Sequence, residues 1–441
     1  MNKFSTQPLR GFSDFYPEEM RVDKWILGKI REVVEGYGYE EWNGPTLESI
    51  DIFAAKSSEE LVTEQAFIVE KVKGEKLILR PELTPSLARM VAAKIKELEL
   101  PLRWYVFPNC FRYERPQRGR RREFIQVNVD ILSHDGLYAD LEIFNIIVDI
   151  MKSFGVTGKQ FQIRWNNRRF LDELLLMVAK VPEGLKNQVY KMIDKRDKME
   201  PAEYEKWVRD TLRDDAAADR VLQIGSFHDI NVLPFDNLPH EFFEYPGVKE
   251  VQQLTEMIKK AGLKPYCTFS PEIVRGLDYY TGTVYEVFDT GTENRRALFG
   301  GGRYDNLIDL FSDVQLPGTG FGLGIYVLEL FLTTYNKIPP EVKLPDRSHG
   351  VYIAPLDASC LLLAIKVAQL LRAQGKQALV GYDCRKLGRQ IETASKRGFP
   401  YVIIIGKKEV DAQSVTLKNL QNGEQQTVPI AEMGKILVSK T

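Results

Sequence analysis

Two strand-like runs on either side of an arginine-rich segment constrain the fold of this chain more than any other feature. The first run is LRWYVFPNCFRYE, from Leu102 to Glu114, and the second is REFIQVNVDIL, from Arg122 to Leu132. Both are rich in β-branched and aromatic residues, and the second alternates polar and apolar positions, as strands do. The pattern predicts an antiparallel pair of strands joined by a long basic loop.

The segment between these runs is strongly basic. Six of the eleven residues from Arg112 to Arg122 are arginine, although the 441-residue chain has a formal net charge of only −1. Guanidinium groups are permanently charged and match phosphate oxygens in shape, so the loop suits a triphosphate or an RNA end. A solvated charged loop without a ligand explains the same spacing, and the pattern does not separate the two interpretations.

Composition excludes several other classes of protein. Hydrophobic residues make up 44% of the chain, enough for substantial cores in two or three domains. The four cysteines are scattered without a CxxC pair, which favours reduced thiols over a zinc site or a disulfide framework, and the four histidines lack metal-ligand spacing. The N-terminus lacks a signal-peptide core, and no run approaches the roughly 20 apolar residues of a membrane helix. We therefore expect a soluble, cytoplasmic protein.

The texture of the sequence changes along the chain and predicts two domains. Residues 1–332 mix helical and strand-like segments, but residues 167–247 within them are charged and helix-like, as expected of an inserted helical subdomain. Residues 333–348 have the composition of a linker. Residues 349–441 alternate strand and helix with short turns, which predicts a small α/β domain with a largely parallel sheet.

Two pairs of polar residues are candidates for contacts with a small ligand. Glu82 and Thr84 are two apart in LRPELTPS, so both point the same way and suit either an ammonium group or a helix N-cap. Gln126 and Asp130 are four apart on the alternating strand and therefore share one face. That face is compatible with exposure to solvent and with a polar pocket.

Two further segments combine glycine and tyrosine. RGLDYYTG contains Arg275, Tyr279 and Tyr280, and GGGRYDNL contains Tyr304. Glycines let a ligand or another backbone approach closely, whereas tyrosines at such positions are compatible with half-buried core as well as with ligand contact. The spacing is not that of a P-loop, and GFGLG lacks the context of a dinucleotide-binding fingerprint.

Taken in order, these segments resemble those of histidyl-tRNA synthetases, which are class II aminoacyl-tRNA synthetases. GYEEWNGPTLE resembles class II motif 1, FRYERPQRGRRREFIQ resembles motif 2, and RGLDYYTGTVYE and GGGRYDNL resemble two signatures of the histidine enzymes. The resemblance covers nearly the whole chain. It implies an α+β class II catalytic domain whose antiparallel sheet has six or seven strands flanked by helices, a helical insertion, and a C-terminal α/β anticodon-binding domain.

The resemblance also implies an activity and partners. L-Histidine is activated with ATP to histidyl-adenylate and is then joined to the 3′ end of tRNA(His), with Mg²⁺ accompanying ATP on protein ligands that the motifs do not identify. A homodimer that packs through motif 1 is expected. A non-catalytic, histidine-binding regulatory paralogue is the alternative, but it lacks the C-terminal domain.

Roles for individual residues follow from the same motifs. Arg112 and Arg275 are the implied catalytic cations at the α-phosphate. The implied histidine-binding residues are Glu82, Leu83, Thr84, Arg112, Gln126, Asp130, Arg275, Tyr279, Tyr280 and Tyr304. The implied ATP-binding residues are Arg112, Glu114, Arg120, Arg122, Phe124 and Arg275. The residues implied at the tRNA acceptor end are Gln117, Arg118 and Arg121.

Four positions in three segments depart from the family pattern. Class II motif 3 usually ends Gly-Leu-Glu-Arg, but GLGIYVLEL has Tyr326 and Val327 at the last two positions. The missing arginine leaves three alternatives. Another cation replaces it, ATP is bound more weakly, or the protein is inactive. Arg121 replaces a usual tyrosine in motif 2, and Asp130 stands where many bacterial members have glutamate. These departures indicate an archaeal or eukaryotic-type member of the family.

Overall fold

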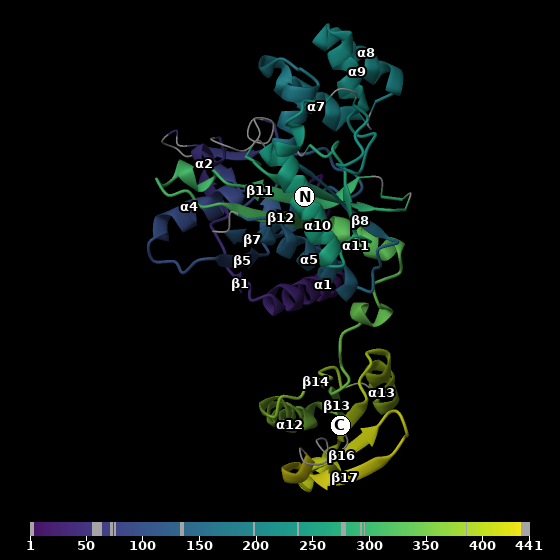
Figure 1. Ribbon diagram of the computed structural model, residues 1–441. Helices are drawn as coiled ribbons and strands as arrows, with labels where there is room; N and C mark the ends of the chain where they lie inside the picture. The colour runs from purple at the N-terminus through teal and green to yellow at the C-terminus, as the bar shows by residue number, and fades with distance from the viewer. Residues whose placement is uncertain are drawn as a thin grey trace. The chain divides into compact units, whose positions relative to one another are not determined.

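The computed structural model describes residues 4–54, 64–70, 74, 76–132, 136–196, 199–235, 238–274, 279–291, 293–294, 296–384 and 386–433. The chain divides into two compact units, Met1–Lys343 and Leu344–Thr441, each with its own hydrophobic core. Figure 1 shows the helices and strands of both units. No helix in the described part of the chain is long and apolar enough to cross a membrane.

A large, mainly antiparallel sheet forms the centre of the first unit. In the described ranges nine strands take part, in the order β1-β5-β7-β12-β11-β10-β8-β9 with β6 paired to β7. They are β1 (Glu40–Glu41), β5 (Leu102–Val106), β6 (Asn109–Phe111), β7 (Glu123–Leu132), β8 (Phe161–Asn167), β9 (Cys267–Phe269), β10 (Thr283–Asp289), β11 (Ala297–Tyr304) and β12 (Gly318–Gly324). Two edge pairs, β1 with β5 and β8 with β9, are parallel. The expected count of six or seven strands is too low, because the short β1, β6 and β9 extend the sheet.

The predicted strand pair around the arginine segment is confirmed. β6 and β7 are antiparallel, with Cys110 opposite Phe124, and the basic loop runs between them. On β7 the alternation of the sequence becomes an alternation of faces, because successive side chains of a strand point to opposite sides of the sheet.

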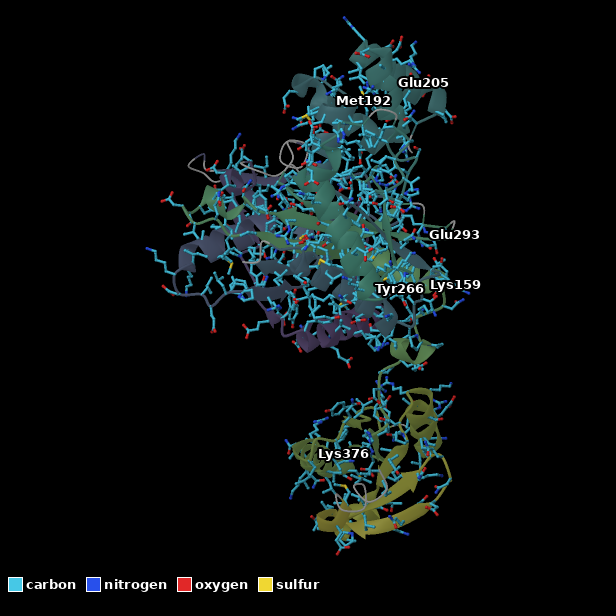
Figure 2. All side chains as sticks on the ribbon, in the orientation of Figure 1. Lys159, Met192, Glu205, Tyr266, Glu293 and Lys376 are labelled. Carbon is cyan, nitrogen blue, oxygen red and sulfur yellow. The ribbon has the colours of Figure 1, made fainter. Side chains whose placement is uncertain are left out.

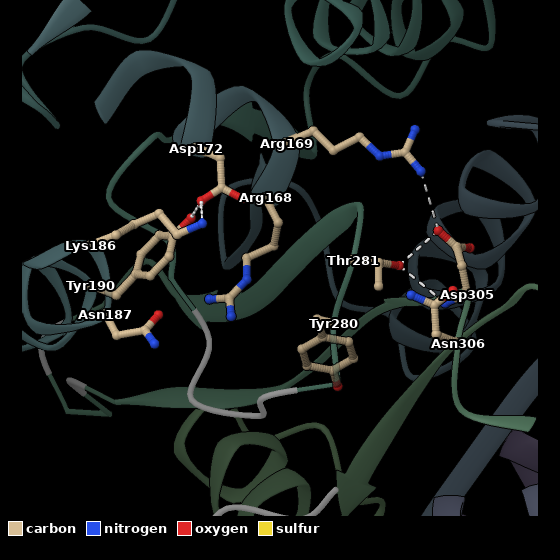
Figure 3. A pocket seen from close by; sticks show the side chains of 10 residues that line it. All are labelled: Arg168, Arg169, Asp172, Lys186, Asn187, Tyr190, Tyr280, Thr281, Asp305 and Asn306. Carbon is tan, nitrogen blue, oxygen red and sulfur yellow. Dashed lines mark hydrogen bonds and ion pairs between the residues drawn. The ribbon is translucent and has the colours of Figure 1, made fainter. Parts of the chain in front are cut away.

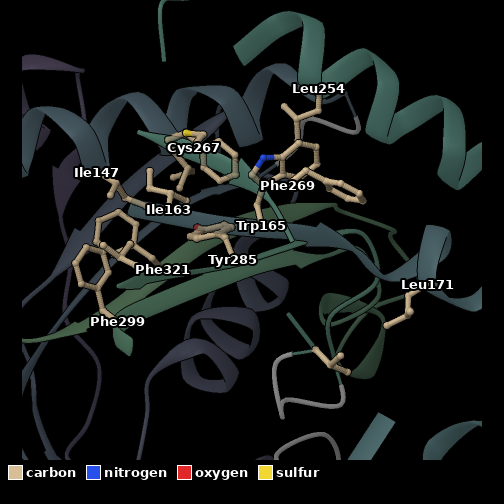
Figure 4. Close-up of a cluster of buried hydrophobic side chains, with 14 of the residues drawn as sticks. Ile147, Ile163, Trp165, Leu171, Leu254, Cys267, Phe269, Tyr285, Phe299 and Phe321 are labelled. Atoms are coloured by element: carbon tan, nitrogen blue, oxygen red, sulfur yellow. The ribbon is translucent and has the colours of Figure 1, made fainter. Parts of the chain in front are cut away.

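Helices cover the apolar face of this sheet. They are α1 (Pro17–Gly36), α5 (Tyr138–Ser153), α10 (Pro246–Lys260) and α11 (Ile325–Thr334). On α1, the side chains of Val22, Ile26, Ile30 and Val34 follow helical spacing and are all buried. Figure 4 shows aromatic side chains from β8 to β12 meeting residues of α5 and α10 in this core. The face therefore needs apolar residues at alternate positions of every strand.

Smaller elements flank the opposite face. They are α4 (Thr84–Lys94), the 3₁₀-helix η5 (Ile308–Leu310), and a three-stranded sheet of β2 (Leu47–Ser49), β4 (Lys76–Leu79) and β3 (Phe67–Glu70) with the short helix α2 (Ile50–Ala54). Gly44 and Pro45 lie between β1 and β2. Pro85 lies in the first turn of α4, where a missing backbone N–H is tolerated.

Helices occupy the charged segment that follows β8. They are α6 (Arg168–Glu173), a π-helix (Leu174–Val178), η2 (Glu183–Leu185), α7 (Lys186–Lys195), α8 (Pro201–Leu212), α9 (Asp215–Gln223) and η4 (Phe242–Glu244). The Asn167 side chain caps α6 by accepting a hydrogen bond from the Phe170 N–H. Figure 2 labels Met192, which is buried on α7, and Glu205, which is exposed on α8. The buried apolar side chains of this segment are continuous with the core of the first unit.

The second unit contains a five-stranded sheet in the order β14-β13-β15-β16-β17. Its elements are β13 (Val351–Pro355), η7 (Ala358–Cys360), α12 (Leu361–Ala373), β14 (Ala378–Val380), α13 (Leu387–Lys396), β15 (Tyr401–Ile405), α14 (Lys407–Asp411), β16 (Ser414–Asn419) and β17 (Gln425–Pro429). The first three strands are parallel, as predicted. The last two are antiparallel, because β16 and β17 form a hairpin whose turn places Gly423 at φ +77°.

Part of the segment expected to be a linker packs on the first unit. Residues Pro340–Lys343 form the 3₁₀-helix η6, and the Arg21 guanidinium on α1 donates two hydrogen bonds to the Lys343 carbonyl oxygen. The first unit therefore continues to Lys343.

Candidate active site

A cavity of about 100 Å³ lies over the polar face of the large sheet. Its lining residues are Glu82, Thr84, Arg112, Gln126, Asn128, Asp130, Tyr279, Tyr280, Gly300, Tyr304, Gly320, Phe321 and Gly322. Eight of the ten residues that the motifs imply for histidine binding are among them. The Leu83 side chain instead belongs to a hydrophobic cluster with Leu87 and Val106. Arg275 lies outside the described residues.

Alternate residues of β7 form the floor of the cavity. Gln126, Asn128 and Asp130 are buried on this face, and Gln126 Nε2 donates a 2.8 Å hydrogen bond to Asn128 Oδ1. Val127 and Val129 point into the core on the other face. Of the two interpretations of this strand, the polar pocket is therefore the correct one. Asn128 was missed, although the same alternation in QVNVD placed it on this face.

Glycines of β12 create the space that these side chains fill. Gly320 pairs with Asp130 and Gly322 pairs with Asn128 across the two strands. A Cβ atom at Gly320 would collide with Asp130 Oδ1 and with the Val129 carbonyl oxygen, and one at Gly322 would lie 2.8 Å from Gln126 Nε2. The Gly-rich strand is thus a requirement of the cavity.

Asp130 has an unusual environment at the bottom of the cavity. The Tyr304 hydroxyl donates a 2.6 Å hydrogen bond to Oδ1, whereas Oδ2 is buried and has no hydrogen-bond partner among the described residues. Burial raises the pKa of Asp130 to about 7, the Glu82 carboxylate adds to the rise, and the bond from Tyr304 opposes it. Buried polar atoms are normally paired, so Oδ2 is available for a donor on a ligand.

Glu82 and Thr84 enter the cavity from the start of α4. The Tyr279 hydroxyl donates a 3.0 Å hydrogen bond to Glu82 Oε2, and both side chains are buried. The N-cap of α4 is Leu83, without a side-chain cap hydrogen bond. The interpretation of Glu82 and Thr84 as a capping pair is therefore wrong.

Arg112 lies where β6 runs into the basic loop. Its Nε donates a 2.9 Å hydrogen bond to the Pro81 carbonyl oxygen, and its guanidinium lies 5.4 Å from the centre of the Phe124 ring. The Arg112 side chain lines the cavity, and the Phe124 ring lies next to it without lining the cavity itself.

Three other arginines of the loop, Arg118, Arg120 and Arg122, contact protein groups. Arg120 pairs with Glu114, and Arg118 Nη1 lies 3.6 Å from Glu293 Oε2. Arg122 packs 3.9 Å over the Tyr113 ring and donates to the Arg10 carbonyl oxygen, and Gln117 pairs with Arg120 through the backbone. These contacts disagree with the interpretation of the basic segment as a loop that is only solvated.

Two of the departures from the family pattern meet at the tip of the loop. The Arg121 guanidinium lies 3.7 Å from the centre of the Tyr326 ring, at the start of α11. Gly119, at φ +84°, lies so close to α11 that a Cβ atom there would be 3.7 Å from Val327. Arg121 is thus a cation beside the position where the motif 3 arginine is missing.

An antiparallel sheet with a polar, glycine-lined cavity, a basic loop between two of its strands and a following α/β unit defines the fold of a class II aminoacyl-tRNA synthetase. A crystal structure of histidyl-tRNA synthetase from Nostoc sp. PCC 7120 has a TM-score of 0.77 with this chain, at 25% identity over 100% of both chains.

The chain belongs to the histidyl-tRNA synthetase family. The sequence model of the family described as "Histidyl-tRNA synthetase" matches residues 11–328, and that of "Anticodon binding domain" matches residues 350–440. The histidine–tRNA ligase of Leptospira biflexa is 38% identical over 98% of this chain and 97% of its own length. That of Thermococcus kodakarensis is 33% identical over 95% of each.

Proposed function

We propose that this protein is a histidine–tRNA ligase that uses ATP to join L-histidine to tRNA(His). The observation that carries the proposal is the buried Oδ2 atom of Asp130, a residue that lines the cavity, because this atom has no hydrogen-bond partner among the described residues. An imidazole ring offers an N–H donor to that oxygen, and Tyr280, which also lines the cavity, is assigned to the second ring nitrogen. A site that pairs both nitrogens rejects amino acids that lack them.

The remaining polar groups of the cavity suit the backbone of the amino acid. We assign Glu82, Thr84 and Gln126 to its ammonium group, since the first supplies a buried negative charge and the others supply oxygen acceptors. The carboxylate is thereby directed toward Arg112 at the rim.

Arg112 and Phe124 suit a nucleotide. We assign the Arg112 guanidinium to the α-phosphate of ATP and the Phe124 ring to adenine, with Glu114, Arg120 and Arg122 around them. The role of Arg275 as a second cation is supported by the motif alone. Mg²⁺ is expected on the phosphates of ATP, and the described residues include no cluster of three His, Cys, Asp or Glu side chains that could hold a metal ion.

These groups support two steps. The histidine carboxylate attacks the α-phosphate in line and pyrophosphate leaves, while Arg112 stabilises the charge that builds on the phosphate oxygens. A ribose hydroxyl of tRNA then attacks the carbonyl carbon of histidyl-adenylate and AMP leaves. Most of the acceleration is expected from positioning and from cationic stabilisation.

We further assign the first unit to the catalytic domain, with residues 167–247 as its insertion, and residues 349–441 to the anticodon-binding domain, in a cytoplasmic homodimer. The expected boundary at residue 332 thereby moves to Lys343, which shortens the expected linker 333–348. Exposed apolar side chains on the small sheet after motif 1, namely Leu47, Ile68 and Val69, support a partner surface there. Sedimentation of the purified chain tests the dimer, and a monomer mass contradicts it.

Pyrophosphate exchange tests the function directly. Exchange between ATP and pyrophosphate is measured without tRNA for histidine and for the other amino acids. We expect exchange with histidine only. If histidine binds by calorimetry but supports no exchange, the protein is the regulatory paralogue instead.

A further inference from the structure

A second, larger pocket lies beside the small cavity of the candidate active site. It has a volume of about 390 Å³ and lies between the helices after β8 and the chain segments next to β10 and β11 (Figure 3). Its lining residues are Arg168, Arg169, Asp172, Lys186, Asn187, Tyr190, Tyr280, Thr281, Asp305 and Asn306. Tyr280 lines both the larger pocket and the small cavity, so the two are neighbours.

Side-chain amides line both, but they are held differently. In the larger pocket, the amides of Asn187 and Asn306 form no hydrogen bond with the described residues (Figure 3). In the small cavity, Gln126 Nε2 donates a 2.8 Å hydrogen bond to Asn128 Oδ1, and both residues are buried. A free amide can turn its oxygen and its nitrogen either way, whereas an amide bonded to a fixed neighbour has one orientation.

Asn128 is such a fixed neighbour. On β7 it lies opposite Gly322 of β12 on one side and opposite Val106 of β5 on the other. Its short side chain has only two torsion angles, so paired backbone on both sides leaves it few positions. Gln126 has three torsion angles and lies beyond the end of the pairing with β5. Its Nε2 packs so closely on the backbone of Gly322 that a Cβ atom there would lie 2.8 Å away.

The direction of the bond decides which atom Gln126 offers to a ligand. Because Nε2 donates to Asn128, the amide oxygen Oε1 is left, and it accepts no hydrogen bond from the described residues. The ammonium group of an amino acid has three donors and no acceptor, so it pairs with an oxygen. A glutamine turned the other way would present N–H groups to that ammonium.

We propose that Asn128 is a positioning residue for recognition of histidine, because it fixes the amide of Gln126 with Oε1 toward the amino group of the ligand. The proposal rests on the proposed function, which assigns Gln126 to that group. Asn128 is not among the residues that the family motifs imply. Ordering a long side chain before the ligand arrives removes an entropic cost from binding.

The test removes the acceptor and measures which part of the ligand is affected. Calorimetry compares N128A with the wild type for L-histidine and for imidazolepropionate, which is histidine without its amino group. N128A is expected to bind histidine about tenfold more weakly, because the oxygen that meets a charged donor is no longer held in place. Its affinity for imidazolepropionate and its KM for ATP in exchange are expected to stay within about twofold of the wild type.

A rescue variant tests the direction of the bond. The carboxylate of N128D only accepts hydrogen bonds, so N128D is expected to hold Gln126 in the same orientation and to keep the preference for histidine over imidazolepropionate. Its new charge also attracts the ammonium directly, and Q126A/N128D measures that attraction alone. In Q126A, the further change N128A is expected to have no effect, since Asn128 acts through Gln126.

The sheet offers a matched control outside the cavity. Gln162 Nε2 donates a 2.6 Å hydrogen bond to Thr268 Oγ1, so T268V also removes the acceptor of a glutamine amide. Neither residue lines the cavity, and T268V is expected to change neither affinity.

Four results overturn the proposal. N128A weakens both ligands equally, N128A leaves histidine binding unchanged, N128A weakens Q126A as much as it weakens the wild type, or N128D loses the preference as N128A does. Because the readout is binding, a wild type that binds histidine without exchange still tests the proposal. A wild type that does not bind histidine overturns the proposed function instead.

Discussion

The two neighbouring sites of the first unit are built in different ways. The small cavity has a floor of polar groups from strands of one sheet, with Glu82 and Thr84 added from the start of α4, and hydrogen bonds such as those from Tyr304 and Tyr279 fix their positions. The larger pocket takes its groups from helices and chain segments, which half-exposed ion pairs hold together. A sheet fixes small distances rigidly, as recognition of one amino acid requires, whereas ion pairs near solvent stabilise weakly and allow the elements to adjust.

The largest expected effect is on the ion pair behind the small cavity. Arg303 and Asp140 form a pair whose side chains are 5% and 0% exposed. D140A leaves the buried Arg303 without its closest carboxylate and with only the longer, 3.5 Å contact to Asp305, so it is expected to lower the free energy of unfolding by about 3–5 kcal/mol. Denaturant unfolding measures it. In the double variant D140A/R303M much of the loss is expected to return, and a loss below about 1 kcal/mol in D140A would mean that the sheet does not depend on this pair.

The next effect concerns the space that glycine provides. G320A places a methyl group against Asp130 and the Val129 carbonyl oxygen, so kcat/KM for histidine in exchange is expected to fall about a hundredfold. G324A is the control on the same strand, because a Cβ atom there has no neighbour within 4 Å. Equal activities of the two variants would contradict the rigid-sheet interpretation.

A smaller effect comes from the pKa of Asp130. The native carboxyl keeps its proton up to about pH 7, whereas the unfolded one loses it near 3.8. The unfolded state binds fewer protons in that interval, so this group makes the free energy of unfolding fall as pH rises, by up to about 1.4 kcal/mol per unit, and the fall ends above about pH 7.

The variant D130N lacks this contribution. Its stability relative to the wild type is expected to rise with pH across that interval and then to level off, measured by denaturant unfolding at each pH. Y304F removes the hydrogen bond that lowers the pKa, so it is expected to extend the interval upward. A constant difference between D130N and the wild type would show that Asp130 ionises normally.

The smallest effect belongs to the larger pocket. The Arg169 side chain is 50% exposed, so R169Q is expected to lower the free energy of unfolding by less than about 1 kcal/mol although it removes contacts to Glu250 and Asp305. The same unfolding assay as for D140A measures it. A loss as large as that of D140A would remove the contrast between the two sites.

The sequence predicted the small cavity better than its surroundings. Alternation in QVNVD assigned Gln126 and Asp130 to one face, but it could not say that this face is buried. Burial depends on β12 and α4, which are distant in sequence. Two- and three-residue strands such as β1 and β9 carry no periodic signal, because pairing with a neighbour creates them.

The larger pocket had almost no signal in the sequence. Its lining comes from four separate segments, and the arginines of NNRR have no spacing that distinguishes Arg168 from Arg169. Folding brings the carboxylates of Glu250 and Asp305 to Arg169, whereas Arg168 forms no ion pair with a carboxylate among the described residues. Charge balance is a property of the folded chain.

The contact between Arg121 and Tyr326 has a consequence for how such a sequence can change over time. Each residue replaces a different one in the family pattern, and the ring of one now supports the charge of the other. Reverting Arg121 alone to the usual tyrosine takes the cation away from the Tyr326 ring, whereas reverting Tyr326 alone to the usual glutamate exchanges the ring contact for an ion pair. The effect of each step therefore depends on the other residue. The two positions, some two hundred residues apart in the printed sequence, are expected to be inherited together and to show strong epistasis in a library that varies both.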